Sequence, residues 1–360
     1  MLVEEIGNIR LHNQQIAGTS FTTAQEMVGW MGAMQAQDYN MAKWAIGARL
    51  PHATDKQIET ALDNGEILRT HVLRPTWHLI SGDDIYWLLE LSASKIKTEL
   101  KSRLKQLELT TAVVAKSKTI LEKALANNSY LTREALVTEM QQSGIPTDNN
   151  RASHLLLCAE LDCIICSGPT KNHKQTYALL PERVPQRQIF AREEALEKLA
   201  QIYFSSHGPA TLQDFTWWSG LSITDARKAL ELVKPSFISA TIGSATYWFR
   251  TESANFTSKP GSAFLLPAFD EFIISYKDRT ASLLLEQHKK AISENGLFRP
   301  VVVIDGKVTG LWNRTMKKDK ILLEINSFHP INNSVRSLMQ KGAEKFGSFL
   351  EKDIEITIIN

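Results

Sequence analysis

Two glutamines flank one small apolar residue at Gln35-Ala36-Gln37, and Asp38 follows them directly. Glutamine does not titrate, so neither amide can act as a strong general base. Each can hold and polarise a water molecule and place its carbonyl oxygen near developing positive charge. Such weak assistance is sufficient only when the leaving group is already activated, as in a cationic N7-alkylated guanine, whose N-glycosidic bond is labile. On the residues alone, an ordinary helix junction is the simpler interpretation.

Two apolar helical segments must position this motif. Thr23 and Glu26 have capping-box spacing, and the apolar pattern that follows predicts a helix ending near Gln35. Asn40 is expected to cap a second helix over residues 41–50. Glutamines two apart at a helix end reach one site only if the helix unwinds there. Asp38, the nearest titratable group, is a secondary catalytic candidate if it points into that site.

The next stretch, residues 67–80, is rich in β-branched and aromatic residues and predicts strands with a break at Pro75. Short helices followed by a hairpin are typical of a winged-helix unit, a variant of the helix-turn-helix. His78 lies on the second predicted strand. It is either a histidine with a satisfied hydrogen bond or another secondary catalytic candidate.

The helix–helix–hairpin order recurs twice. Thr132 is expected to cap a helix over 133–143, and a hairpin with a polar tip at 171–174 follows a further helix over 148–162. Thr211 and Ser222 are expected to cap two more helices, before strands on either side of Gly243-Ser244. The sequence therefore predicts an α+β chain of tandem winged-helix units, with segments at 1–125, 126–188, 189–258 and a mainly β region at 259–360.

That last region is expected to form a sheet with a closing helix. Asp305-Gly306 has the composition of a hairpin turn. We expect strands over 264–267, 272–275, 301–304, 307–312, 321–325 and 354–359, and a helix over 333–350.

The charge of the chain neither establishes nor excludes a nucleic-acid partner. Net charge is +2 and charged residues make up 22% of the 360 positions, which leaves room for a local basic face. The basic residues between Lys95 and Lys123 are either a solvated helix face, which the pattern alone favours, or a stripe that contacts phosphates. No apolar run is long enough for a membrane span, and no signal peptide is expected.

Cofactor and metal motifs are absent or weak. The chain has no phosphate-binding loop, no dinucleotide glycine motif and no His-Glu-x-x-His, so we expect no cofactor. Cys163 and Cys166, with Cys158 and His154 upstream, are the best metal candidate. Residues three apart on a predicted strand point to opposite sides, however, so we expect no metal. Three clustered cysteines also favour a reducing cytoplasm over disulfide bonds.

Paired carboxylates occur once more, at Asp270-Glu271, with Asp278-Arg279 nearby. Two neighbouring carboxylates could perform acid–base chemistry. An ion pair to Arg279 is the interpretation that the sequence favours.

Several strings together resemble the AlkZ/YcaQ family of bacterial winged-helix proteins. The resemblance runs in order over nearly the whole chain, and its strings Asp-Phe-x-Trp-Trp-Ser-Gly-Leu and Leu-Leu-Pro-Ala-Phe-Asp-Glu are specific. The matching stretches are residues 35–37, 73–79, 208–211, 214–221, 265–271, 276–279, 305–307 and 310–312.

The resemblance implies three winged-helix units in a C-shaped molecule with a channel for double-stranded DNA. It implies a monofunctional DNA glycosylase that removes N7-alkylpurines, including those in interstrand crosslinks, at an open site and without metal or cofactor. The motif of the family is glutamine, an apolar residue, then glutamine or aspartate. Carried over, the catalytic positions are Gln35 and Gln37.

The resemblance implies double-stranded DNA carrying alkylated purines as the partner. We also expect no membrane association and a monomer in the cytoplasm. A non-catalytic winged-helix DNA-binding protein or transcription regulator is the alternative. The residues expected to contact DNA are Arg69, Arg74, Lys101, Arg103, Lys171, Lys174, Lys317 and Lys318.

Overall fold

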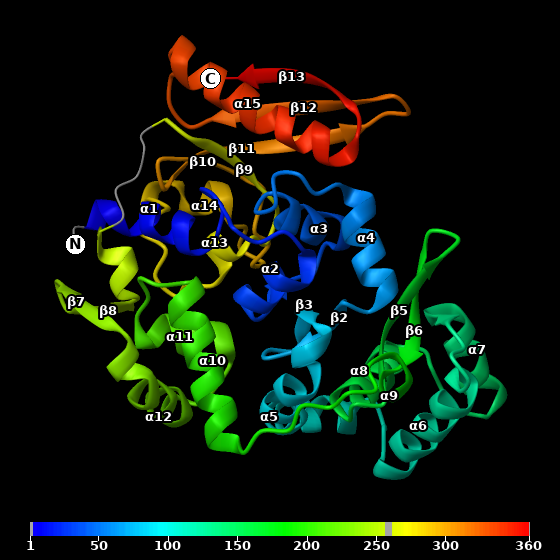
Figure 1. Cartoon of the computed structure of the whole chain (residues 1–360). Coiled ribbons are helices and arrows are strands. Elements are labelled where there is room, and N and C mark those ends of the chain that lie inside the picture. The colour runs from blue at the N-terminus through cyan, green and yellow to red at the C-terminus, as the bar shows by residue number, and fades with distance from the viewer. Residues whose placement is uncertain (1–2, 256–260, 360) are drawn as a thin grey trace. The chain divides into compact units, whose positions relative to one another are not determined.

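The computed structural model describes residues 3–255 and 261–359 (Figure 1). Contacts divide the chain into two compact units. The first contains residues 1–58 and 196–360, and the second contains residues 59–195. Helices and strands occur in both, so the predicted α+β class is confirmed.

The first unit begins with the elements around the glutamine motif. Thr23 and Glu26 form the predicted capping box at the start of α2. The motif itself follows α2 in a short strand and a bend. The elements are α1 (Val3–Asn13), α2 (Ala24–Met31), β1 (Met34–Gln35) and α3 (Tyr39–Gly47); α4 (Asp55–Asn64) continues into the second unit.

A second part of this unit contains three helices and a hairpin. Thr211 and Ser222 cap α11 and α12 as predicted, each accepting the backbone N–H three residues further on. An antiparallel bridge joins Ala210 to Trp248 beside the hairpin. The elements are α10 (Arg192–Ser206), α11 (Leu212–Ser219), α12 (Ile223–Val233), β7 (Ile238–Ile242) and β8 (Ala245–Phe249).

The C-terminal part of the unit is a five-stranded sheet in the order β13-β12-β11-β10-β9 (Figure 1). Asp305 and Gly306, both at positive φ, make the predicted turn between β10 and β11. The last strand pairs parallel with β12 because α15 provides the crossover between them. The strands are β9 (Ala263–Leu266), β10 (Val301–Ile304), β11 (Lys307–Met316), β12 (Lys320–Ser327) and β13 (Asp353–Ile359), and the helices are α13 (Glu271–Ile274), α14 (His288–Ala291) and α15 (Asn333–Leu350).

Both faces of this sheet carry apolar contacts. Phe346 of α15 packs edge-on against Trp312 on one face. On β9 and β10, Phe264 and Val303 belong to a core cluster that includes Leu11 of α1 and Phe272 of α13. The sheet therefore joins the C-terminal region to the N-terminal helix through buried side chains.

The second unit contains a hairpin, a long helix and a compact helical module with its own sheet. Thr132 caps α7 as predicted. The three-stranded sheet has the order β4-β6-β5. The elements are β2 (Ile67–Val72), β3 (Thr76–Ser81), α5 (Ile85–Gln106), α6 (Thr111–Leu125), β4 (Leu131–Thr132), α7 (Arg133–Gln142), α8 (Arg151–Leu161), β5 (Ile165–Lys171), β6 (Lys174–Leu179) and α9 (Leu180–Arg183).

One order of elements occurs three times along the chain: a helix, a short strand or bridge, two helices and a hairpin. It covers α2 to β3, α6 to β6, and α10 to β8. The predicted recurrence of helices followed by a hairpin is therefore present in the structure.

Three local predictions are wrong. The helix before the motif ends at Met31 and not near Gln35, because Gly32 adopts φ 75°. Asp38, not Asn40, caps the next helix. Residues 272–275 do not form a strand, because Asp270 caps the short helix α13 by accepting the N–H of Phe272.

Candidate active site

A buried carboxylate, that of Glu271, binds the backbone of Gln35. Its backbone N–H donates to Glu271 Oε1 at 2.6 Å, and its side chain is only 6% exposed. The side-chain oxygen Oε1 is buried and has no hydrogen-bond partner among the residues that the structure describes. A buried acceptor without a donor is costly, and such groups concentrate where a water or a ligand binds.

Gln37 lies in a bend between β1 and α3, and it is exposed. The chain is not helical from Gly32 to Asp38, so the requirement that the helix unwind before the motif is met. A Cβ atom at Gly32 would lie 2.7 Å from Ile202, which together with the positive φ restricts this position to glycine. One short segment thus presents a buried and an exposed amide two residues apart.

Asp38 is occupied by helix capping. Its Oδ1 accepts the N–H of Met41 at 3.1 Å, and it is the N-cap of α3. Burial lowers the pKa of Arg314, on β11, and the negative charge of Asp38 acts in the opposite direction. The contacts of this carboxylate are those of a structural group beside the motif.

His78 belongs to the second unit, on β3. It is fully buried, and its Nδ1 lies 2.9 Å from the carbonyl oxygen of Thr76. This contact fits the interpretation of a core histidine with a satisfied hydrogen bond.

A buried polar cluster surrounds Glu271 in the first unit. Its Oε2 accepts from Trp218 Nε1 at 3.2 Å and from the Ser275 hydroxyl, and lies 3.7 Å from His207 Nε2. Burial lowers the pKa of His207, and the neighbouring Glu271 opposes that shift. Sequence reasoning missed Glu271 as a partner of the motif, because 236 residues separate it from Gln35.

The neighbouring carboxylate, Asp270, has a different partner from the one expected. Arg49 binds it with two hydrogen bonds, Nη1 to Oδ2 at 2.9 Å and Nη2 to Oδ1 at 3.0 Å, and both side chains are buried. The Nε of Arg279, the expected partner, donates to the carbonyl oxygen of Ile273 at 3.0 Å. The predicted pairing of the carboxylates with Arg279 is corrected for Asp270, whose cationic partner, Arg49, lies in the turn after α3.

The basic tip of the β5–β6 hairpin in the second unit is exposed. Lys171 ends β5 and Lys174 begins β6. They pair across the hairpin, with Asn172 and His173 at positive φ between them. Arg69, on β2, is held more firmly: its Nη1 donates to Gln175 at 2.7 Å and its guanidinium lies over the Trp77 ring. The two lysines and Arg69 therefore each place positive charge on a hairpin.

The other cations expected to contact DNA differ in exposure. Arg74 is half-buried after β2, whereas Lys101 and Arg103 are exposed on α5. Lys317 and Lys318 are exposed at the β11–β12 turn of the first unit, where Lys352 Nζ binds both of their carbonyl oxygens.

Part of the basic stretch on α5 and α6 has internal partners. Lys97 and Lys118 both pair with Asp162, and Lys116 Nζ donates to the carbonyl oxygen of Ser143 at 2.6 Å. These three lysines stabilise the second unit itself. The stretch is therefore not a uniform stripe of free cations.

Cys158 and Cys166 are buried and Cys163 is half-buried. Burial raises the pKa of Cys163 to about 11 and that of Cys166 to about 12, so both thiols stay protonated at neutral pH. Within residues 3–255 and 261–359, no group of three or more His, Cys, Asp or Glu side chains is placed to hold a metal ion.

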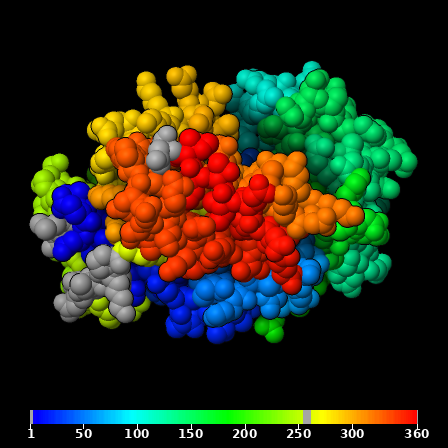
Figure 2. All heavy atoms as spheres, turned by 90° about the horizontal axis from the view of Figure 1, so that it is seen from above, coloured from blue at the N-terminus to red at the C-terminus, as the bar shows by residue number. Residues whose placement is uncertain are grey.

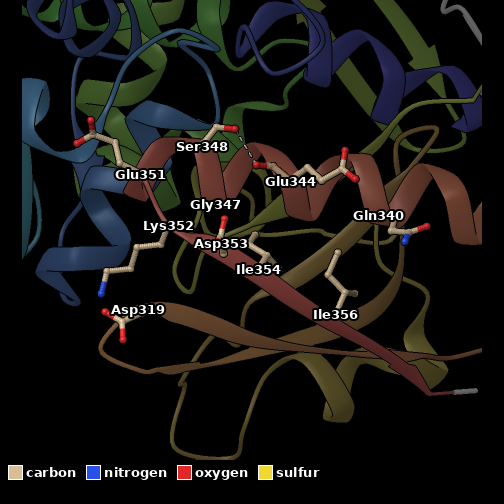
Figure 3. Close-up of a pocket in the computed structure, with 10 residues that line it drawn as sticks. All are labelled: Asp319, Gln340, Glu344, Gly347, Ser348, Glu351, Lys352, Asp353, Ile354 and Ile356. Carbon is tan, nitrogen blue, oxygen red and sulfur yellow. Dashed lines mark hydrogen bonds between the residues drawn. The ribbon is translucent and has the colours of Figure 1, made fainter.

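A hollow of about 620 Å³ lies between α15 and the edge strand β13 (Figure 3). Acidic side chains dominate its lining: Asp319, Glu344, Glu351 and Asp353. Residues of α15, β12 and β13, in orange and red, gather on the surface that Figure 2 shows from above. Because phosphates are repelled by carboxylates, this hollow is not the candidate site for DNA.

The comparisons with known proteins define the class of the chain. The model of the DNA glycosylase AlkZ-like family matches residues 28–349, and the chain belongs to this family. It is 23% identical over 322 residues to an interstrand DNA cross-link repair glycosylase from Streptomyces sahachiroi, covering 84% of this chain and 85% of that protein. The solved structure of the Streptomyces sahachiroi DNA glycosylase AlkZ has the same fold, with a TM-score of 0.83, 20% identity and 99% of each chain covered.

None of the described helices combines the length and the apolar composition that a membrane-spanning helix requires.

Proposed function

We propose that this chain is a monofunctional DNA glycosylase that hydrolyses the N-glycosidic bond of cationic N7-alkylpurines in DNA, including those in interstrand crosslinks. The observation that carries the proposal is the buried, unpartnered Oε1 of Gln35, two residues from the exposed amide of Gln37. Membership of the AlkZ-like DNA glycosylase family supports this proposal. The Streptomyces relative is named as an interstrand DNA cross-link repair glycosylase, which supports crosslinked bases as substrates.

In the proposed mechanism, the two amides hold one water against C1′ of the damaged nucleotide. The bond between C1′ and N9 breaks and its electron pair moves to the purine, which loses its positive charge. The water oxygen bonds to C1′ and its proton passes to solvent, because neither glutamine can accept it. The carbonyl oxygens of the amides stabilise the oxocarbenium-like transition state.

This chemistry limits the substrate. A neutral purine is a poor leaving group and would need a strong acid or base, which two amides do not supply. Asp38, the carboxylate nearest to the motif in the sequence, caps α3. We therefore expect the protein to act on cationic bases and to leave unmodified DNA intact. An open site would let it reach a base too bulky to rotate out of the duplex.

The recurring order of elements supports tandem winged-helix units as the DNA-binding frame. We propose that these units lie within residues 1–125, 126–188 and 189–258, before the β-rich region at 259–360. The C-shaped outline and DNA channel that the resemblance implies belong to the same proposal, as do a monomeric state, a cytoplasmic location and the absence of a cofactor.

A strand-scission assay separates the glycosylase from the alternative, a DNA-binding protein without catalysis. The protein is incubated with a duplex that carries one 7-methylguanine, and alkali then cleaves any abasic site. We expect scission at the lesion and none in the same duplex with guanine. Binding to both duplexes without scission would overturn the proposal and favour a regulator, which should instead protect a palindromic or repeated sequence.

A further inference from the structure

Glu271 connects the glutamine motif to two other segments of the chain. The carboxylate accepts the backbone N–H of Gln35 on one oxygen, and the indole N–H of Trp218 and the hydroxyl of Ser275 on the other. Its side chain is almost completely buried. The three donors come from β1, from α11 and from the residue after α13.

These contacts favour the ionised carboxylate. Peptide N–H and indole N–H groups can only donate, so they fit an acceptor without a proton. Burial lowers the pKa of the neighbouring His207, whose ring is therefore neutral at neutral pH and does not cancel the charge. A fixed negative charge thus lies directly behind the peptide of Gln35.

We propose that Glu271 is a positioning residue for the glutamine motif, holding the Gln35 peptide so that the buried amide keeps one direction. This inference rests on the proposed function of the motif. Glutamine has several rotatable bonds, and a reacting group must be held closely to be effective. Glu271 fixes the backbone from which that side chain extends. The buried charge also favours positive charge at the neighbouring site.

The alternative is that Glu271 only stabilises the fold. Asp214 provides a matched control, because it is another buried carboxylate of the same unit, binding Thr211, Lys277 and Arg10. These partners of Asp214 do not include Gln35 or Glu271. Removing its charge should therefore reduce stability without a specific effect on base release.

The test compares wild type, Glu271→Gln and Asp214→Asn in the full-length protein at a temperature well below unfolding. The single-turnover rate of 7-methylguanine release is measured at saturating protein, and the dissociation constant for the same duplex is measured by anisotropy. We expect Glu271→Gln to lower the rate about 10- to 100-fold and to leave the dissociation constant within about twofold. Asp214→Asn should keep the rate.

A rate for Glu271→Gln within twofold of wild type would overturn the inference, as would an equal loss in Asp214→Asn. If Glu271→Gln does not fold, Ser275→Ala removes one donor to the same carboxylate. It should lower the rate about threefold, and an unchanged rate would contradict the inference. No base release by wild type would show that the proposed function itself is wrong; release by wild type with no effect at Glu271 would reject only its positioning role.

Discussion

Gln14 and Gln35 are both buried glutamines of the first unit, but their side-chain amides differ in hydrogen bonding. Gln14 Oε1 accepts from Arg49 and its Nε2 donates to the Tyr276 hydroxyl. Gln35 Oε1 has no such partner among the described residues. Unpaired buried amides reduce stability, so the fold alone gives no reason to keep a glutamine at position 35. A function in binding water or substrate would explain the glutamine at this position.

A pair of substitutions tests this difference. Gln35→Met removes the unpaired oxygen while keeping a similar volume, so it should raise the free energy of unfolding by about 1 kcal/mol and abolish most base release. Gln14→Met should instead destabilise by about 2 kcal/mol, because Arg49 and Tyr276 lose a partner. Denaturant unfolding and the scission assay measure both effects. A destabilised Gln35→Met would contradict the interpretation.

The sequence leads to Gln35 and Gln37 only through the resemblance, because two glutamines at a helix junction are not distinctive by themselves. The burial of one and the exposure of the other come from the fold. The contacts of Arg49 with Asp270 and of Glu271 with Gln35 could not be predicted from the sequence for a different reason. Their contacts join residues more than 200 positions apart, and local spacing does not encode such pairs.

At the scale of elements, α3 depends on Asp38 for its first turn. Asp38→Ala should lower the free energy of unfolding by about 1 kcal/mol, because the N–H of Met41 loses its acceptor. Asp38→Asn should retain the cap and most base release, since the asparagine oxygen can accept the same bond. Thermal unfolding and single-turnover release check this. Loss of release in Asp38→Asn with a normal melting temperature would identify Asp38 as a catalytic base.

The basic tip of the β5–β6 hairpin leads to a prediction about DNA binding. Replacing Lys171 and Lys174 by alanine should weaken binding similarly for all sequences and reduce the slope of log K against log salt by about 2. Lys341→Ala with Lys345→Ala, on α15, removes the same charge from exposed positions without a proposed role. Anisotropy at several salt concentrations compares the two. Equal slopes in both double variants would exclude the β5–β6 hairpin as a DNA contact.

Local rules predicted many of the elements. The caps at Thr23, Thr132, Thr211 and Ser222 depend on residues only three apart, and the structure contains all four. The strand predicted at 272–275 failed because its apolar composition suits a buried helical turn equally well. The capping carboxylate of Asp270 decides between them.

At the scale of the whole molecule, the two compact units divide the candidate residues. Gln35, Gln37 and Asp38 belong to the first unit, together with the basic β11–β12 turn. The β5–β6 hairpin and Arg69 belong to the second. Composition did not predict this division, because the first unit is built from two separate parts of the sequence. If the proposed function holds, substitutions at the β5–β6 hairpin should affect DNA binding without changing the unit that contains the glutamine pair.

His207 makes the stability of the first unit depend on pH. Burial lowers its folded pKa below the ordinary value of 6.5, so the unfolded chain binds a proton at a higher pH than the folded chain. Stability should therefore fall as pH drops below about 6.5, by up to about 1.4 kcal/mol per pH unit until the folded pKa is reached. Unfolding measured between pH 7.5 and 5.5 should show a weaker pH dependence in His207→Gln. Identical pH dependence would contradict this.

The most direct test of the central claim is the appearance of free 7-methylguanine, measured by mass spectrometry in a single turnover with wild type and Gln37→Ala. Wild type should release the intact base, and Gln37→Ala should release almost none while binding the duplex within a few-fold of wild type. Equal release by the two proteins, or release by neither, would contradict catalysis by the glutamine pair.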